Sequence, residues 1–443
     1  MNKNVVFKNF LKYVSLNVLG MIGLSCYILA DTFFVSKALG ANGLAALNFS
    51  ISIYCIVSGA GLMIGMGGAT KYAILKAQNE HEAANAMFTH TFMLGVGVGI
   101  VFALIGMFLT TPIAKLLGAD QSTLSMTVTY LTTILCFAPC FILNNVFIAF
   151  IRNDGSPKLS MAAMLVGSLS NILLDYVFIF PFSMGMFGAA FATGLAPVIS
   201  MGILSLHFIK KHNQFRLVRS KIRIKYIGDV LSLGLSAFIT EVSSGIVLIV
   251  FNLVILGLEG NVGIAAYGIV ANFALVGTAI FTGIAQGIQP LASNGYGMKD
   301  HKMLKHLLGY AFILSSVIAT MMYVLVFIGS ENIIAAFNSE NNRALIPIAT
   351  DGFKLYFMGF FFAGLNIIAC AFLSATEQPR KAFLISIIRG GVAIIPLVFI
   401  LSRLLGMKGV WLSFVFAEII AATFTIVHLF HLKKLRVQGE PVN

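Results

Sequence analysis

The sequence predicts an all-α membrane protein with twelve transmembrane helices arranged in two pseudo-symmetric six-helix lobes. Apolar residues make up 58% of its 443 residues and charged residues 10%, whereas a soluble domain is about 25% charged. A run of about 18 or more apolar residues is long enough to span a bilayer. Such runs occur near residues 12–35, 48–71, 88–110, 123–150, 159–181, 187–209, 230–257, 264–290, 304–329, 347–375, 382–402 and 408–430.

The two halves of the chain resemble each other at a nearly constant spacing. Residues 44–47 match residues 264–267 at a spacing of 220, and residues 185–188 match residues 406–409 at 221. Short matches at one shared spacing indicate an internal duplication. Because each copy holds an even number of spans, both copies enter the membrane in the same sense and form parallel repeats. Parallel repeats predict two lobes with a cleft between them.

A basic connection separates the two predicted lobes. Residues 210–229 contain the longest charged connection, and six predicted spans lie on either side of it. We therefore expect an N-terminal lobe at residues 1–209, a linker at 210–229 and a C-terminal lobe at 230–443.

The distribution of positive charge predicts the orientation in the membrane. Lys and Arg number 22 in the set of alternate connections that includes both termini and 5 in the opposite set. Because positive residues stay on the cytoplasmic side, we expect a multi-pass plasma-membrane protein with both termini in the cytoplasm. The net charge of +13 then follows from topology, so no nucleic-acid partner is expected. The basic connections can contact anionic lipid.

The five cysteines all fall within predicted spans. Cys136 and Cys140 are four residues apart on one helix face, which is a spacing that metal pairs use. No histidine or further cysteine joins them in sequence, so we expect packing roles, no disulfide, no zinc and no other cofactor.

The candidate functional residues of the first half are acidic side chains inside apolar runs, together with polar residues near them. Asp31 and Asp175 lie at similar depths in two outward-running spans. Asn171 shares a helix face with Asp175, and Thr193 lies about two turns into the next span. Acids within a membrane are costly and usually functional. Oxygen ligands suit a hard cation such as sodium, whereas paired carboxylates can share a proton. Hydrogen bonding between helices would explain Asn171 and Thr193 equally well.

The second half carries a different set of charges. Glu241 lies inside the seventh span without a carboxylate partner, so it is a candidate second protonation site or substrate-binding residue. Glu418 and Arg389 lie in neighbouring spans, where we expect them to neutralise each other. Asp351 and Lys354 lie near a span end and are expected at the interface.

Two further features concern the helices themselves. Gln286, Gln289 and Pro290 end the eighth span, where a break would open backbone groups to the cavity. Glycines between Gly59 and Gly68 predict close helix packing, with flexible turns as the alternative.

These segments resemble the multidrug and toxic compound extrusion (MATE) family of secondary transporters. The resemblance covers nearly the whole chain and rests on residues 30–32, 40–47, 171–175, 188–193 and 265–268. It implies twelve helices in two lobes that export bulky, often cationic compounds against an inward flow of protons or sodium.

The resemblance also implies roles for individual residues. Family members bind the coupling ion at positions that match Asp31, Asn171, Asp175 and Thr193, and Glu241 resembles an acid implicated in some members. The chain departs from the family where many members carry a proline early in spans one and seven, because neither span has one here.

We therefore interpret the chain as an ion-coupled antiporter and not an enzyme. Its expected partners are hydrophobic, often cationic small molecules and the lipid bilayer, and a monomer is compatible with this role. One alternative is a flippase for lipid-linked sugars or lipids in the same superfamily, whose cavity often carries basic residues. A more remote alternative is a membrane-embedded lipid enzyme, which would need clustered His, Asp, Glu or nucleophilic residues.

Overall fold

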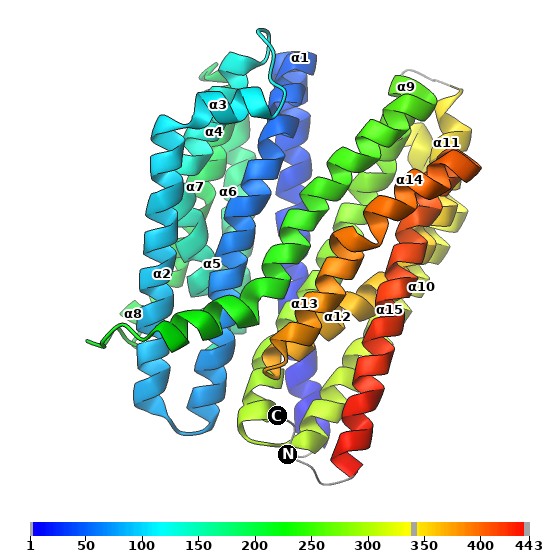
Figure 1. The fold of residues 1–443 in the computed structure, drawn as a ribbon. Helices are drawn as coiled ribbons and strands as arrows, with labels where there is room; N and C mark the ends of the chain where they lie inside the picture. The colour runs from blue at the N-terminus through cyan, green and yellow to red at the C-terminus, as the bar shows by residue number, and fades with distance from the viewer. Residues whose placement is uncertain (1–2, 338–342, 438–443) are drawn as a thin grey trace.

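A computed structural model describes residues 3–337 and 343–437, and Figure 1 shows their helices in two bundles that lie side by side. The first bundle contains α1 (Lys3–Ala77), α2 (His81–Phe108), α3 (Thr110–Leu116), α4 (Leu124–Cys136), α5 (Ala138–Asn153), α6 (Pro157–Ile179), α7 (Gly185–Leu204) and α8 (Leu206–Ile209). The second contains α9 (Ile224–Gly297), α10 (His301–Phe337), α11 (Leu345–Tyr356), η1 (Phe357–Gly359), α12 (Phe360–Ala375), α13 (Pro379–Ile387), η2 (Ile388–Val392), α14 (Ile394–Leu405) and α15 (Met407–Val437).

The two longest helices each turn back on themselves. α1 has 75 residues and α9 has 74, so each would be about 110 Å long if straight. Gly40 (φ 64°, ψ −155°) interrupts α1, and Gly260 (φ 59°, ψ −148°) interrupts α9. Glycine adopts this positive φ readily because it has no Cβ. Each helix therefore provides two antiparallel arms, and α1 stays helical up to Gly40 without the family's proline bend.

The spans agree with the predicted number. Ten helical segments in the described parts of the chain are long and apolar enough to cross a membrane. The pair α4 and α5, bent by 46° between them, makes an eleventh span. Counting the two arms of α9 separately gives the predicted twelve.

The duplication is also visible in the backbone. Residues with positive φ recur in the two halves at spacings of 220 or 221 residues. The pairs are Gly40 with Gly260, Asn79 with Lys299, and Gly185 with Gly406. The same tight turns therefore connect corresponding helices in the two bundles.

The start of α1 packs against the second bundle. Val6, Phe10 and Val14 are buried in one hydrophobic core with Ile288 and Leu304 of the second bundle. In Figure 1 the dark-blue beginning of α1 accordingly lies beside the helices of that bundle. α1 begins and α15 ends at the same end of the molecule, which we call the terminal face.

Candidate functional site

The four predicted site residues of the first bundle are all buried. Asp31 comes from α1, Asn171 and Asp175 from α6, and Thr193 from α7. Their exposed fractions are 6%, 0%, 0% and 3%, respectively. Asp31 lies nine residues before the turn at Gly40. The helix continues further beyond Asp31 than the apolar run indicates, so Asp31 lies deeper than one turn from its end.

A hydrogen-bond network joins three of these residues. With the Asn171 amide oriented to satisfy both of its neighbours, its Nδ2 donates to Asp175 Oδ2 at 3.0 Å. Its oxygen then accepts from the backbone N–H of Thr193 at 3.2 Å. The Thr193 hydroxyl donates to the Ala189 carbonyl at 3.0 Å. Asn171 therefore links α6 to α7 and holds one oxygen of Asp175.

Each carboxylate keeps one oxygen without a partner. The Oδ1 atoms of Asp31 and Asp175 are buried and accept no hydrogen bond. The two groups are close enough for the charge of Asp31 to act on Asp175, and both act on Tyr130 of α4. A buried carboxylate oxygen without a donor is costly. The arrangement can lower that cost by taking up a proton or a hard cation.

A tyrosine pair lies close to acids of both bundles. The hydroxyls of Tyr27 and Tyr54, one on each arm of α1, are 2.8 Å apart and hydrogen-bonded. The charges of Asp31, Asp175 and Glu241 all act on Tyr27. Sequence reasoning missed Tyr27, Tyr54 and Tyr130 because tyrosine is common in apolar helices and nothing in their spacing marks them.

Glu241 faces the first bundle from α9. Its side chain is half-buried, and a Cβ built at Gly59 of α1 would lie 3.4 Å from the Glu241 Cβ. The structure therefore places Glu241 at the contact between the bundles and not in the cluster around Asp31.

The predicted ion pair of the second bundle is confirmed. Arg389 Nη2 donates to Glu418 Oε1 at 2.8 Å, and Arg389 Nε donates to the same oxygen at 3.1 Å. Asn366 Nδ2 donates to Glu418 Oε2 at 2.7 Å. Arg389 lies in η2, a π-helical turn inside the eleventh span. Asp351 and Lys354, predicted at the interface, are both half-buried, and the Asp351 carboxylate lies 3.6 Å from Lys408 Nζ.

A polar seam joins the bundles toward the terminal face. Arg152 of α5 is only 1% exposed. It donates from one nitrogen to Asn17 of α1 and Gln286 of α9, both at 2.8 Å. No described carboxylate pairs with it. The sequence suggested a basic residue in a cytoplasmic connection, but the fold buries Arg152 between the bundles.

The seam continues one turn further toward the terminal face. Gln289 of α9 accepts from Asn153 at 3.0 Å and donates to Thr70 of α1 at 2.9 Å. Lys71 of α1 forms an ion pair with Glu377, in the turn between α12 and α13. Five side chains from separate parts of the fold therefore hold the bundles together here, in addition to Arg152 and its partners.

Glycines allow the backbones to meet along this seam. A Cβ at Gly67 of α1 would lie 1.9 Å from the Val230 carbonyl of α9, and one at Gly283 would lie 2.6 Å from Val18 Cα. The packing role predicted for the glycines between Gly59 and Gly68 is confirmed at Gly67.

The predicted helix break at Pro290 is wrong, because α9 continues through it to Gly297. Buried Gln289 and its partners support the helix around the proline.

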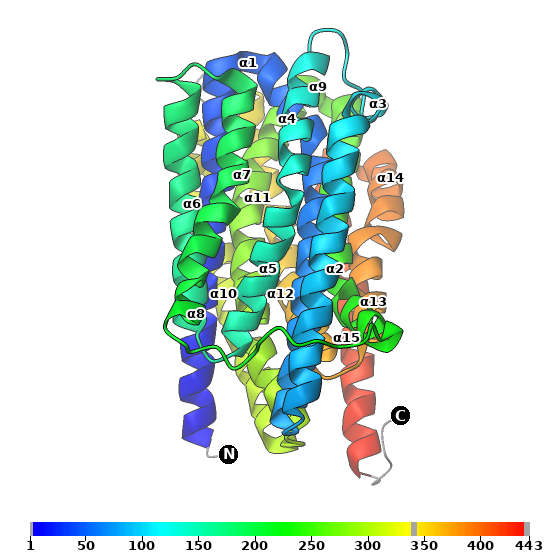
Figure 2. The same ribbon diagram turned by 90° about the vertical axis from the view of Figure 1, so that its left-hand side faces the viewer.

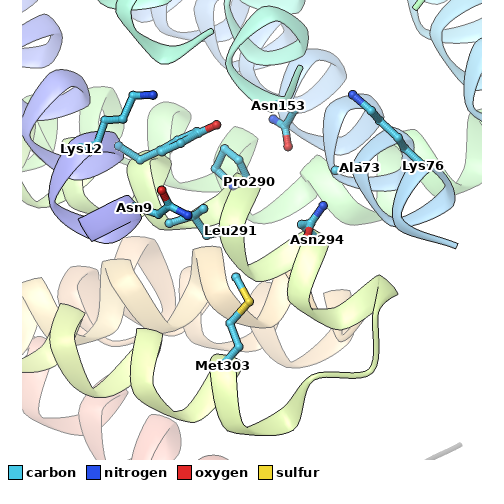
Figure 3. A pocket seen from close by; sticks show the side chains of 10 residues that line it. Asn9, Lys12, Ala73, Lys76, Asn153, Pro290, Leu291, Asn294 and Met303 are labelled. Atoms are coloured by element: carbon cyan, nitrogen blue, oxygen red, sulfur yellow. The ribbon is translucent and has the colours of Figure 1, made fainter. Parts of the chain in front are cut away.

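A small pocket opens beside the seam on the terminal face. Its volume is about 270 Å³, and its lining comes from α1, α5, α9 and α10. Figure 3 shows Lys12 and Lys76 on opposite sides of it, with Asn153 and Pro290 between them. Tyr13, which also lines it, precedes Asp31 by 18 residues, or about 27 Å along a helix. This pocket is therefore separate from the acidic cluster.

The cysteines, for which packing roles were predicted, lie on several different helices. All five cysteines are free thiols. Among the described residues, no three His, Cys, Asp or Glu side chains lie together as a metal site would require.

Twelve spans in two bundles, with a cluster of two buried carboxylates without full partners in the first bundle, define a membrane transporter. A family model described as MatE matches residues 18–177 and 237–400. The chain belongs to the MatE family, and it is a transporter and not an enzyme.

Individual relatives agree with this assignment. The chain is 27% identical over 433 residues to the multidrug export protein MepA of Staphylococcus saprophyticus, covering 97% of this chain and 95% of that protein. It has the fold of a MATE transporter solved in an outward-facing conformation, with a TM-score of 0.90, 21% identity and 96% coverage of both chains. The Vibrio cholerae MATE transporter VcmN, solved as a mutant, gives a TM-score of 0.89 at 18% identity, covering 99% of this chain and 98% of that chain.

Proposed function

We propose that this protein is an ion-coupled antiporter that exports hydrophobic, often cationic drugs by alternating access. The coupling ion, a proton or sodium, is taken up by Asp31 and Asp175 with help from Asn171 and Thr193. The observation that carries the proposal is the pair of buried carboxylate oxygens without any donor. The name of the staphylococcal relative supports drug export as the activity.

The two lobes, residues 3–209 and 230–437, rock against each other in this proposal. The polar seam holds the terminal face closed, so the state described here opens toward the opposite face. An ion drives the cycle because its affinity for the Asp31 site differs between the two states. Glu241, at the contact between lobes, serves as a second protonation site or binds the positive charge of the substrate.

The protein is proposed to lie in the plasma membrane with both termini in the cytoplasm. The excess of Lys and Arg in connections on the terminal face supports this orientation. Reporter fusions after Asn443 and within residues 210–223 should both report a cytoplasmic position. A periplasmic or extracellular signal from either fusion would overturn the orientation.

The flippase alternative is less well supported. Basic residues in a cavity would bind the phosphates of a lipid-linked sugar. Arg389 is instead neutralised by Glu418, and Arg152 is enclosed within the seam.

The test is transport by purified protein in vesicles, with proton and sodium gradients imposed separately. Asp31→Asn keeps the size of the side chain but removes its titrating charge, so it should retain folded yield and lose gradient-driven export. Asp175→Asn should behave similarly, and Asn171→Ala and Thr193→Ala should have weaker effects.

The matched control is Asp351→Asn, which makes the same change at a half-buried residue near a span end. It should transport like the wild type. Wild-type export by Asp31→Asn under an imposed gradient would remove Asp31 from the mechanism. The gradient that supports export in the wild type identifies the coupling ion.

A further inference from the structure

The connection between the bundles is an extended segment fixed to the first bundle. We call residues 210–223 the strap, and Figure 2 shows it crossing the molecule from α8 past α2 to the start of α9. Its backbone N–H groups donate to side chains of the first bundle at 2.8–3.0 Å. The pairs are Gln214 to Asp154, Arg216 to Asn85, Val218 to Thr89, and Arg223 to His90.

One buried ring also anchors the strap. Phe215 is 0% exposed and packs against Tyr72, Phe88 and Phe150. An anchored backbone has already lost its conformational freedom, so its exposed side chains can bind a partner at a smaller entropic cost.

The positive charges of the strap have no acidic partner within the described protein. Asp154 is the acid beneath the strap, but Lys76 contacts it at 2.7 Å and His207 at 3.0 Å. No described acid forms an ion pair with any basic side chain of the strap or of the first turn of α9. These residues are Lys210, Lys211, Arg216, Arg219, Lys221, Arg223 and Lys225.

Large aliphatic side chains are exposed among these charges. Leu217 is 58% exposed, Ile222 70% and Ile224 83%. An anchored segment that exposes aliphatic groups beside cations has the character of a membrane-interface element. The aliphatic groups can enter the acyl boundary while the cations stay at the level of the headgroups.

We propose that the strap is a docking site for anionic phospholipid headgroups of the leaflet at the terminal face. Arginine binds phosphate oxygens in a bidentate manner, and the strap supplies three arginines. An uncharged or zwitterionic headgroup lacks the net negative charge that complements this surface. Because the strap is bonded to α2 and leads directly into α9, bound lipid holds the junction of the two bundles at the bilayer surface.

The test measures lipid retention by the full-length protein. The protein is purified in a nonionic detergent and given equal amounts of phosphatidylglycerol and phosphatidylcholine, and bound lipids are counted by native mass spectrometry. The wild type should retain phosphatidylglycerol preferentially, and the preference should fall as salt is raised.

The variant neutralises three exposed side chains of the strap together, Arg216→Gln, Arg219→Gln and Lys221→Gln. Its preference for phosphatidylglycerol should fall by about ten-fold or more, because each cation near an anionic surface contributes to binding. None of these side chains anchors the strap, so the thermal midpoint in detergent should stay unchanged and show that the variant is folded.

The matched control removes the same charge elsewhere on the terminal face, with Lys8→Gln, Lys302→Gln and Lys305→Gln. These exposed lysines lie outside the strap, so the control should keep the wild-type preference. Equal loss in the control and the strap variant would overturn the proposal in favour of a general charge effect. Equal retention of the two lipids by the wild type would also overturn it.

Discussion

Replacing Glu418 by glutamine should destabilise the second bundle, because it leaves the Arg389 cation without a carboxylate. Glu418 is 2% exposed and the Arg389 side chain 10% exposed, so water cannot replace the lost partner. Arg389 donates to the two carboxylate oxygens at 2.8, 3.1 and 3.3 Å. Removing one member of a buried pair costs about 3–5 kcal/mol. Arg389→Gln should cost a similar amount, because it strands the carboxylate.

The double variant Arg389→Gln with Glu418→Gln should recover much of the loss. It contains no unpaired charge, and neutral replacement of a buried ion pair is often tolerated. Asn366 can still donate to the amide oxygen at position 418, since it contacts Glu418 Oε2 at 2.7 Å. The structure therefore predicts strongly non-additive effects of the two substitutions.

Thermal unfolding of purified protein in detergent is the assay. In a chain this long, each kcal/mol corresponds to roughly 1–2 °C, so each single variant should unfold about 3–10 °C below the wild type. The double variant should unfold within a few degrees of the wild type. A double variant no more stable than the worse single variant would refute the structural role of the pair.

Two further predictions concern the seam. Gln286→Leu removes an acceptor of Arg152, so it should weaken closure of the terminal face. Cysteines introduced in the seam should then react faster with a water-soluble thiol reagent. An unchanged rate of labelling would contradict this prediction. Gly67→Val should abolish transport because its side chain would meet the Val230 carbonyl, whereas Gly97→Val, with no atom within 4 Å of its Cβ, should transport normally. Normal transport by Gly67→Val would show that the close approach at the seam is dispensable.

The buried acids were predictable from sequence because holding a carboxylate inside a membrane span costs free energy. A carboxylate within an apolar run needs a reason to be there, so Asp31 and Asp175 are conspicuous without any structure. Asn171 is four residues from Asp175 and shares its helix face, which places the amide beside the carboxylate. The pairing of Arg389 with Glu418 was predictable for the same reason. Two opposite charges in neighbouring spans each lower the free-energy cost of burying the other.

The seam could not be predicted in the same way. Arg152 lies at the end of an apolar run, where the sequence resembles any cytoplasmic boundary. Its partners Asn17 and Gln286 are 135 and 134 residues away, on two different helices. These groups meet only because the two bundles pack together. The spacing of residues along the sequence therefore does not predict the contact.

The helix α1 links the proposed ion site to the seam. Its first arm carries Asp31 and, 14 residues earlier, Asn17, which bonds to Arg152. That separation is about 21 Å along the helix. Val14 of the same arm packs against Gly287 of the second bundle, so movement of this arm changes contacts at the seam.

In the proposed mechanism, an ion at Asp31 and the closure of the terminal face therefore act on one rigid element. Coupling between two sites requires an element with two arrangements that both sites favour unequally. The first arm of α1 meets the structural part of this requirement, because it contacts both bundles and carries one of the two carboxylates. We expect ion binding to change the equilibrium of the seam through α1, and expect Gln286→Leu to change the ion affinity of the Asp31 site in return. Reciprocity of this kind is a thermodynamic necessity if the two sites are coupled.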